Sequence, residues 1–242
     1  MSMPSAAESE TKGLAGIPRI RVAFPRTVRL VTTARLREAV LRALVDSDAE
    51  RIELEEIEAA TSTRLIVQAR GTAALPAAQL ISGVAHAAFI NASFGYAKPS
   101  ELNRFNGPDR GAWYAALAVE TSLAEVSYHM TAFLERAGDF HAVVDYAELF
   151  ASLAGEYCDL RKARRHPALD PDPALGYPAG NALAQAALAD DVNGFIYPSV
   201  RHKGGTCFAV LWPHAVQSVA QGAVYRLTWA GTPVPAAERL TQ

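Results

Sequence analysis

Residues 104–125, RFNGPDRGAWYAALAVETSLAE, combine a turn-rich loop, a short apolar run and the start of a helical pattern. Two arginines, Arg104 and Arg110, lie in the loop, and Tyr114 stands in the apolar run. Glu125 follows where a carboxylate gains from the dipole at the start of a helix. Cations, an aromatic ring and an acid are the side chains that a pocket for an anionic, ring-bearing ligand needs.

The residues that follow predict the clearest helix of the chain, because apolar side chains recur at helical spacing before a glycine suited to a C-terminal cap. The stripe comprises Leu123, Val126, Met130, Phe133 and Leu134, and the glycine is Gly138. Strands are predicted over residues 19–31, 62–69, 140–146, 195–197, 207–212 and 224–229. Short strands mixed with a few helices, without a regular βαβ rhythm, indicate an α+β fold.

The N-terminal third differs in character from the rest. Residues 1–18 are small, polar and interrupted by proline and glycine, which predicts a disordered or weakly docked tail. Residues 34–46 and 49–60 predict two helices without catalytic features. We therefore interpret residues 19–80 as an extension packed on a main domain of residues 81–235.

A proline-rich segment divides the second half of the chain. Residues 161–180 contain Pro167, Pro171, Pro173 and Pro178 and predict a loop, whereas the alanine-rich residues 181–189 predict a helix. Long loops inside a domain are often lids or partner-facing elements.

Composition narrows the class of protein. Half of the 242 residues are hydrophobic, which is enough for a core without disulfide staples. The net charge of -2 argues against a general nucleic-acid binder, although RKARRH at residues 161–166 is a basic patch.

The sequence contains neither a signal-peptide core nor a membrane-spanning run, so we expect a cytoplasmic protein. Cys158 and Cys207 lack metal-ligand spacing, and we expect free buried thiols and no metal site.

Four residues are candidates for chemistry, although the GxGxxG, GxxxxGK, GxSxG and HExxH motifs are absent. Arg104 could bind a diphosphate through its planar guanidinium or be a solvated loop residue. Tyr114 could stack on a heterocycle or fill the core. Glu125 could stabilise positive charge on a sugar ring during glycosidic cleavage, or be a solvated helix residue. Ser199, in the turn YPSVRHKGG, could hydrogen-bond a ligand amide or ribose, but it lacks the partners of a nucleophile.

The spacing of these four residues resembles the RES family, named for its arginine, glutamate and serine. The matching pieces are RFNGPDRGAWYAALAVETSLAEV at residues 104–126 and GFIYPSVRHKGGTCFAVLWP at residues 194–213. Members are toxins of bacterial toxin–antitoxin pairs. The resemblance implies a fold similar to ADP-ribosyltransferase toxins, with short strands in a split sheet or sandwich and an NAD⁺ cleft between them.

The resemblance also implies a role for each candidate. Arg104 would bind the phosphates of NAD⁺, and Tyr114 would contact the nicotinamide or its ribose. Glu125 would act on that ribose, and Ser199 would anchor the nicotinamide end.

Other positions follow from the same resemblance. A further arginine near the start of the family domain could be either Arg29 or Arg64. Thr206 stands where the family often has an asparagine, and Arg110 is interpreted as structural.

The implied activity is cleavage of the nicotinamide–ribose bond of NAD⁺, with water or inorganic phosphate as acceptor and no metal. The same residues would also serve a protein mono-ADP-ribosyltransferase acting on a target protein, and a non-catalytic binding module is a further alternative. The implied partner is a helix-turn-helix (Xre-like) antitoxin, bound in a hetero-oligomer and contacting residues 161–180.

Overall fold

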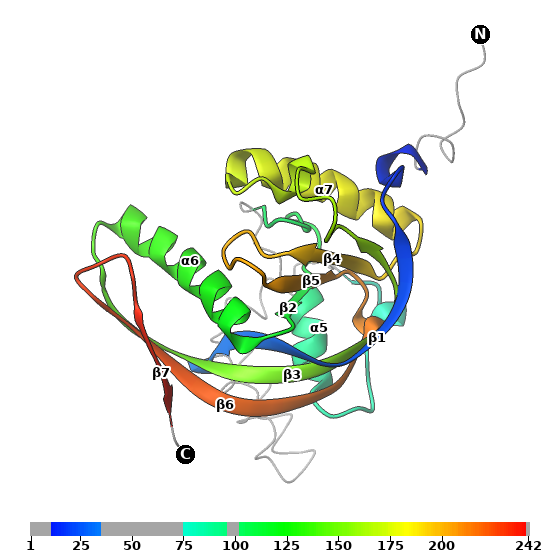
Figure 1. Cartoon of the computed structure of the whole chain (residues 1–242). Helices are drawn as coiled ribbons and strands as arrows, with labels where there is room; N and C mark the ends of the chain where they lie inside the picture. The colour runs from blue at the N-terminus through cyan, green and yellow to red at the C-terminus, as the bar shows by residue number, and fades with distance from the viewer. Residues whose placement is uncertain (1–10, 35–74, 96–101, 241–242) are drawn as a thin grey trace.

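The computed structural model describes residues 11–34, 75–95 and 102–240 (Figure 1). The strands are β1 (Arg19–Thr32), β2 (Trp113–Ala116), β3 (His141–Asp159), β4 (Gly194–Pro198), β5 (Thr206–Val210), β6 (Val216–Ala230) and β7 (Ala236–Leu240). The helices are α5 (Ala87–Gly95), α6 (Val119–Ala137) and α7 (Pro173–Ala189), with short 3-10 helices η1 (Thr11–Leu14), η2 (Ala77–Gln79), η3 (Pro167–Leu169) and η4 (Pro213–Ala215). The mixture confirms the predicted α+β class.

The strands are joined in a closed circuit. Neighbours follow the order β1-β2-β5-β4-β3-β6-β7, and β1 also pairs with β3. β3, with 19 residues, makes the closure possible: one edge pairs with β1, while β6 and then β4 pair along the other. The strands predicted over 140–146 and 224–229 are shorter than β3 and β6, because the alternating pattern is interrupted at the register shift between Ala147 and Leu149 of β3. Strand β1 also has a register shift, between Phe24 and Thr27, but its predicted range of 19–31 differs from its observed bounds by only one residue. That shift lies at Pro25, which has no N–H to donate to the neighbouring strand.

The elements lie in layers. In Figure 1 the long strands β1, β3 and β6 form one curved layer, β4 and β5 lie above it, and α7 lies above β4 and β5. Helix α6 stands to one side, over the ends of β3 and β6. This arrangement brings the start of α6 close to the turn between β4 and β5, although the helix and the turn are far apart in sequence.

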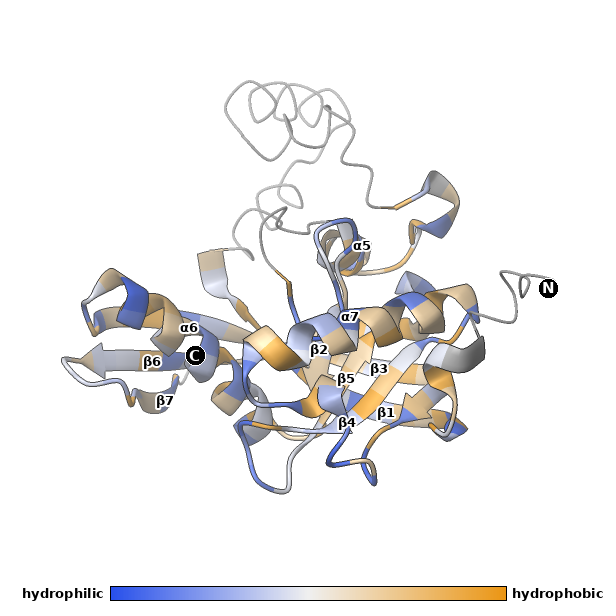
Figure 2. Cartoon of the chain, turned by 90° about the horizontal axis from the view of Figure 1, so that it is seen from above, coloured by the Kyte–Doolittle hydropathy of each residue, from blue (hydrophilic) through white to orange (hydrophobic). Residues whose placement is uncertain are grey.

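Three apolar clusters hold these layers together. Trp113, Leu149, Leu153, Tyr157, Ile196 and Phe208 fill the space between the two layers of strands. Phe105, Leu160, Leu183, Ala184, Ala187 and Phe195 are buried where α7 crosses β4 and β5, and Figure 2 shows apolar residues gathered there. Tyr146, Leu227 and Trp229 pack against α6. Full burial of one such large side chain contributes roughly 2 kcal/mol, so each layer is held by several large contributions.

Helix α6 forms as its sequence pattern predicts. Leu123, Val126 and Met130 of the predicted stripe pack on the cluster that contains Trp229. Gly138 ends the helix in a left-handed conformation with φ of 73°, and its N–H bonds to the last carbonyls of the helix. The helix is therefore anchored along one face and sharply terminated, which fixes where its first turns lie.

The prediction of a loop over residues 161–180 is wrong for its second half, because α7 begins at Pro173. Proline at the first helical position costs nothing, since the N–H there would have no helical partner. Asp172 caps the helix by accepting a hydrogen bond of 2.9 Å from the N–H of Ala174. Pro178 lies inside the helix, where the packing of α7 on the sheet outweighs the missing hydrogen bond.

The N-terminal predictions have mixed outcomes. Leu14 is buried, with 4% of its surface exposed, so the expected tail does not extend over residues 11–18. β1 is a strand of the main sheet, whereas the predicted helices over residues 34–46 and 49–60, and the strand over 62–69, lie outside the described residues. The domain boundary at residue 81 stays a prediction. Of the helices that the structure describes, none has the length and apolar character needed to cross a membrane.

Candidate active site

The structure brings Glu125 and Ser199 into direct contact. The hydroxyl of Ser199 donates a hydrogen bond of 2.6 Å to Oε1 of Glu125. The same hydroxyl accepts hydrogen bonds from the N–H groups of Arg201, at 3.1 Å, and His202, at 2.9 Å. A hydroxyl offers one donor and two acceptor positions, so all three are in use. Ser199 therefore connects the carboxylate rigidly to the turn that follows β4.

The turn after β4 is held against the start of α6. The N–H of Ser199 donates to the carbonyl of Gly205 at 2.9 Å, which closes the turn. Thr121 Oγ1 lies 2.9 Å from Nδ1 of His202 and fastens the turn to the helix. A Cβ at Gly205 would lie only 2.6 Å from Thr121 Oγ1, so this close approach requires glycine.

Cys207 also contacts Glu125, although sequence reasoning did not assign it to the site. Its Sγ lies 3.7 Å from Oε1 of Glu125. Burial, reinforced by the charge of Glu125, raises the pKa of the Cys207 thiol well above its usual range, so it remains a neutral donor. Both cysteines are free and buried, as predicted. A lone cysteine in an apolar strand carries no sequence signal that would connect it to a distant glutamate.

Arg104 is buried and is bonded to the segment that precedes α7. Its Nη1 donates to the carbonyls of Ala168, at 2.6 Å, and Asp170, at 2.9 Å, and only 7% of the residue is exposed. Helix α7 approaches closely because it presents glycines: a Cβ at Gly180 would lie 1.9 Å from the carbonyl oxygen of Arg104. The guanidinium lies 5.4 Å from the centre of the Tyr177 ring. The contacts of Arg104 are therefore made with the protein itself.

Tyr114 holds the turn that contains Arg104. Its hydroxyl donates to Oδ1 of Asn106 at 2.9 Å and accepts from the N–H of Phe105, also at 2.9 Å. Burial raises the pKa of Tyr114 well above its usual range, because the phenolate would lose its hydration there. The tyrosine thus links β2 to residues 104–106, which lie beneath α7.

The other arginines singled out from the sequence have different surroundings. Arg29 donates to the carbonyl of Tyr114 at 3.2 Å, with its guanidinium 4.9 Å from the Trp113 ring, while Arg64 lies outside the described residues. Arg110 donates to Oε1 of Gln79 and to the carbonyl of Leu211, contacts that agree with its structural interpretation.

Tyr197, the tyrosine of the YPS triplet, lies near Glu125 and Cys207 on one side and near Phe105 on the other. Burial, reinforced by the neighbouring Cys207 and Glu125, raises the pKa of its hydroxyl well above the usual range. Its ring packs edge-on against Phe105, with the centroids 5.0 Å apart. Its place directly before Pro198-Ser199 was a usable signal that the sequence reasoning did not take up.

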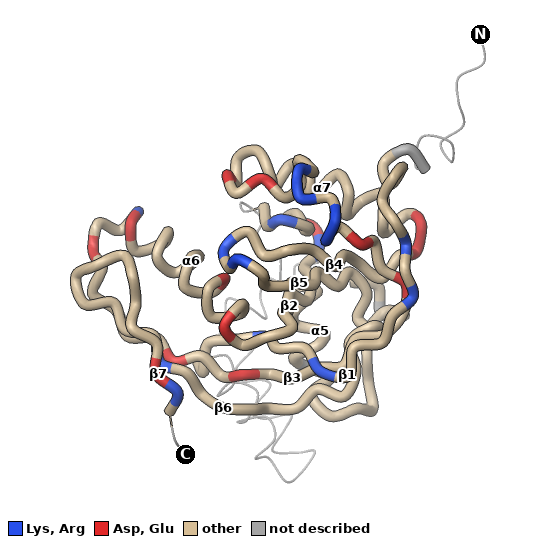
Figure 3. Tube along the Cα trace, in the orientation of Figure 1, with Lys and Arg blue, Asp and Glu red and all other residues tan. Residues whose placement is uncertain are grey.

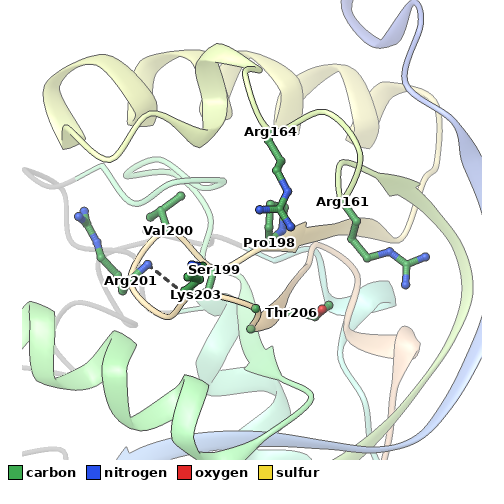
Figure 4. A pocket seen from close by; sticks show the side chains of 10 residues that line it. Arg161, Arg164, Pro198, Ser199, Val200, Arg201, Lys203 and Thr206 are labelled. Atoms are coloured by element: carbon green, nitrogen blue, oxygen red, sulfur yellow. Dashed lines mark hydrogen bonds between the residues drawn. The ribbon is translucent and has the colours of Figure 1, made fainter.

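A cavity of about 470 Å³ opens beside Ser199 and is lined by basic side chains. Its polar lining includes Arg161, Arg164, Ser199, Arg201, Lys203 and Thr206 (Figure 4). Lysines and arginines gather on the loop before α7 and on the turn between β4 and β5 (Figure 3). Because Ser199 bonds to Glu125 and also lines the cavity, the carboxylate adjoins a pocket of positive charge.

Comparison with known proteins identifies the family. Residues 80–230 match the RES domain, a range that contains all four predicted site residues. A search of curated proteins found no match. Among solved structures, the crystal structure of the M. tuberculosis MbcT-MbcA toxin-antitoxin complex is similar with a TM-score of 0.45 and 15% identity, covering 91% of this chain and 93% of that chain. The family match covers more than half of the 242 residues, and the chain therefore belongs to the RES domain family.

Proposed function

We propose that this protein cleaves the nicotinamide–ribose bond of NAD⁺ by hydrolysis or phosphorolysis and acts as the toxin of a toxin–antitoxin pair. The observation that carries the proposal is the 2.6 Å hydrogen bond from Ser199 to Glu125, which orients a carboxylate beside a basic cavity. A positioned anion next to cations suits a substrate that develops positive charge on its sugar and carries phosphates.

The chemistry requires little of the protein besides position and charge. The C1′–N bond breaks, its electron pair leaves with nicotinamide as a neutral molecule, and positive charge develops on the ribose ring. Glu125 would stabilise that charge through Oε2, because the Ser199 and Cys207 contacts are both made to Oε1. An oxygen of water or phosphate then bonds to C1′ and releases a proton to the solvent.

Ser199 and Arg104 differ from their expected roles in this proposal. The Ser199 hydroxyl has no free donor or acceptor position, so it acts by positioning Glu125 rather than by holding nicotinamide. Arg104 and Tyr114 act indirectly in this proposal: Arg104 fixes the segment before α7, and Tyr114 fixes the turn of residues 104–106. Binding energy then serves to orient the ribose against a carboxylate that is already in place.

The direct test is incubation of the purified protein with NAD⁺, with and without inorganic phosphate, followed by product identification by mass spectrometry. ADP-ribose is the expected product of hydrolysis, and ADP-ribose-1″-phosphate that of phosphorolysis, each with free nicotinamide. An ADP-ribose adduct on a protein would replace this proposal by protein ADP-ribosylation. Intact NAD⁺ after prolonged incubation would refute it.

The proposed partner is a helix-turn-helix antitoxin encoded beside the toxin, as the family resemblance implies. Arg201 lies 2.7 Å from the carbonyl of Pro171, so the proline-rich segment borders the basic cavity, and a protein bound there would cover it. Co-expression with the product of a neighbouring short gene should yield a complex without NAD⁺ turnover. Undiminished NAD⁺ turnover in the presence of the protein encoded by that gene would contradict the pairing.

A further inference from the structure

The four cations of the basic cavity are not equivalent. Arg161 is neutralised by Asp159, to which it donates twice, at 2.9 Å and 2.7 Å. Arg201 donates to the carbonyl of Pro171, and its guanidinium carbon lies over the ring of Tyr128, 3.4 Å from the ring centre. These two side chains therefore already have partners that hold them in place.

Arg164 and Lys203 remain without such partners. Neither forms a hydrogen bond or an ion pair with the residues that the structure describes, and no aspartate or glutamate lines the cavity. Figure 4 shows Arg164 reaching from the loop before α7 toward Pro198, while Lys203 and Ser199 line the cavity from the turn after β4. Two uncompensated positive charges around one cavity repel each other unless an anion lies between them.

The loop that carries Arg164 is held in place from two sides. Arg104 binds the carbonyls of Ala168 and Asp170, and Arg201 binds the carbonyl of Pro171. All three carbonyls belong to the segment that directly follows Arg164. This anchoring keeps the Arg164 loop over the cavity, and Arg104 contributes to the cavity by positioning that loop.

We infer that Arg164 and Lys203 form a phosphate-binding site that adjoins the Glu125–Ser199 pair. This inference rests on the proposed function for the origin of the phosphate, which is either the diphosphate of NAD⁺ or the free phosphate that attacks the ribose. Guanidinium and ammonium donors form short, charge-assisted hydrogen bonds with phosphate oxygens. Arg104 is a positioning residue for this site.

The test compares two double variants by isothermal titration calorimetry with ADP-ribose and with inorganic phosphate. Arg164→Ala/Lys203→Ala removes the two proposed ligands. Lys162→Ala/Arg165→Ala removes the same charge from the same region, but these residues line a separate cavity that shares only Arg164 with the first. All four side chains are exposed, so both variants should fold.

We expect the first variant to bind one of the two ligands at least about tenfold more weakly, and the control to stay within about threefold of wild type. The loss should shrink as salt is added, because the contacts are partly exposed. Equal losses in both variants would show only a general effect of charge and would overturn the site. Unchanged binding in the first variant would overturn it as well.

Steady-state kinetics separates the two sources of phosphate. A raised KM for NAD⁺ in phosphate-free buffer assigns the site to the diphosphate, whereas a raised KM for phosphate at unchanged KM for NAD⁺ assigns it to the attacking phosphate. The binding experiment does not need turnover. If wild type binds phosphate through Arg164 and Lys203 but leaves NAD⁺ intact, the site stands and the proposed function fails.

Discussion

The residues that the sequence singled out gather at two turns of this protein, and the two turns differ in what these residues contact. The turn of residues 104–106 is buried under α7, and Nη1 of Arg104 and the hydroxyl of Tyr114 bond to the protein. The turn of residues 199–205 borders a cavity, and it holds Glu125 while leaving Lys203 exposed. Residue type alone therefore does not distinguish a ligand-binding group from a structural one, whereas the partners of each polar atom do.

The largest expected effect is at Glu125, which the turn of residues 199–205 holds in place. Glu125→Gln should lower kcat about a thousandfold, because it removes the negative charge that meets the developing cation. ADP-ribose affinity should change little, since that charge matters mainly in the transition state. Steady-state kinetics and calorimetry on the same preparation measure both quantities.

The control is Glu120→Gln, because Glu120 is an exposed glutamate of the same helix. This variant should retain the kcat of wild type. A large loss of kcat in both variants would mean that turnover depends on the total charge of α6 and not on the position of Glu125.

A somewhat smaller effect, on stability, is expected in the buried turn. Arg104→Ala should lower the free energy of unfolding by about 3 kcal/mol, because two carbonyls lose a charged donor in a buried place. Urea denaturation followed by circular dichroism measures this difference, with the exposed Arg165→Ala as the matched control. If Arg104→Ala were as stable as wild type and yet failed to bind NAD⁺, the comparison would reverse and Arg104 would be the phosphate ligand.

Ser199→Ala should have an intermediate effect on turnover. Without its hydroxyl donor, Glu125 is less well oriented, and kcat should fall about thirtyfold while KM for NAD⁺ stays similar. Ser199→Thr, which keeps a hydroxyl, should recover part of the loss. A raised KM at unchanged kcat would instead assign Ser199 to direct contact with the nicotinamide end.

The smallest expected effect belongs to the Tyr114 hydroxyl. Tyr114→Phe should cost about 1 kcal/mol of stability, since Asn106 and the N–H of Phe105 lose a partner. Turnover at saturating NAD⁺ should remain within about twofold of wild type. A larger loss of turnover would place the Tyr114 hydroxyl in contact with the substrate.

The same variant provides a test by pH. Burial raises the pKa of Tyr114 well above its usual range, so the folded state keeps the proton to higher pH than the unfolded state. Its contribution to stability is thus fully present below about pH 10 and is lost as the pH rises above that value. The stability difference between wild type and Tyr114→Phe should therefore shrink above about pH 10.

Local patterns in the sequence were sufficient for part of the fold. The apolar stripe and Gly138 predicted α6, and short apolar runs located the cores of β4 and β5, because a helix or strand against a core has a fixed period. The same patterns failed at α7, because proline was read only as a helix breaker and not as a favoured first residue. They also ended the predicted strands at 140–146 and 224–229 too early, because the register shift between β3 and β6 is bridged only by the pairing of these two strands.

The sequence by itself determined the α+β class, the helix that carries Glu125 and the four candidates for the site. Only the tertiary structure decided which groups these candidates contact. The bond between Glu125 and Ser199 spans 74 residues, and that between Arg104 and Ala168 spans 64, so neither can be derived from local periodicity. Both depend on how the closed circuit of strands stacks α7 and α6 around it. A polar side chain acquires its role from the donors and acceptors that this packing places beside it.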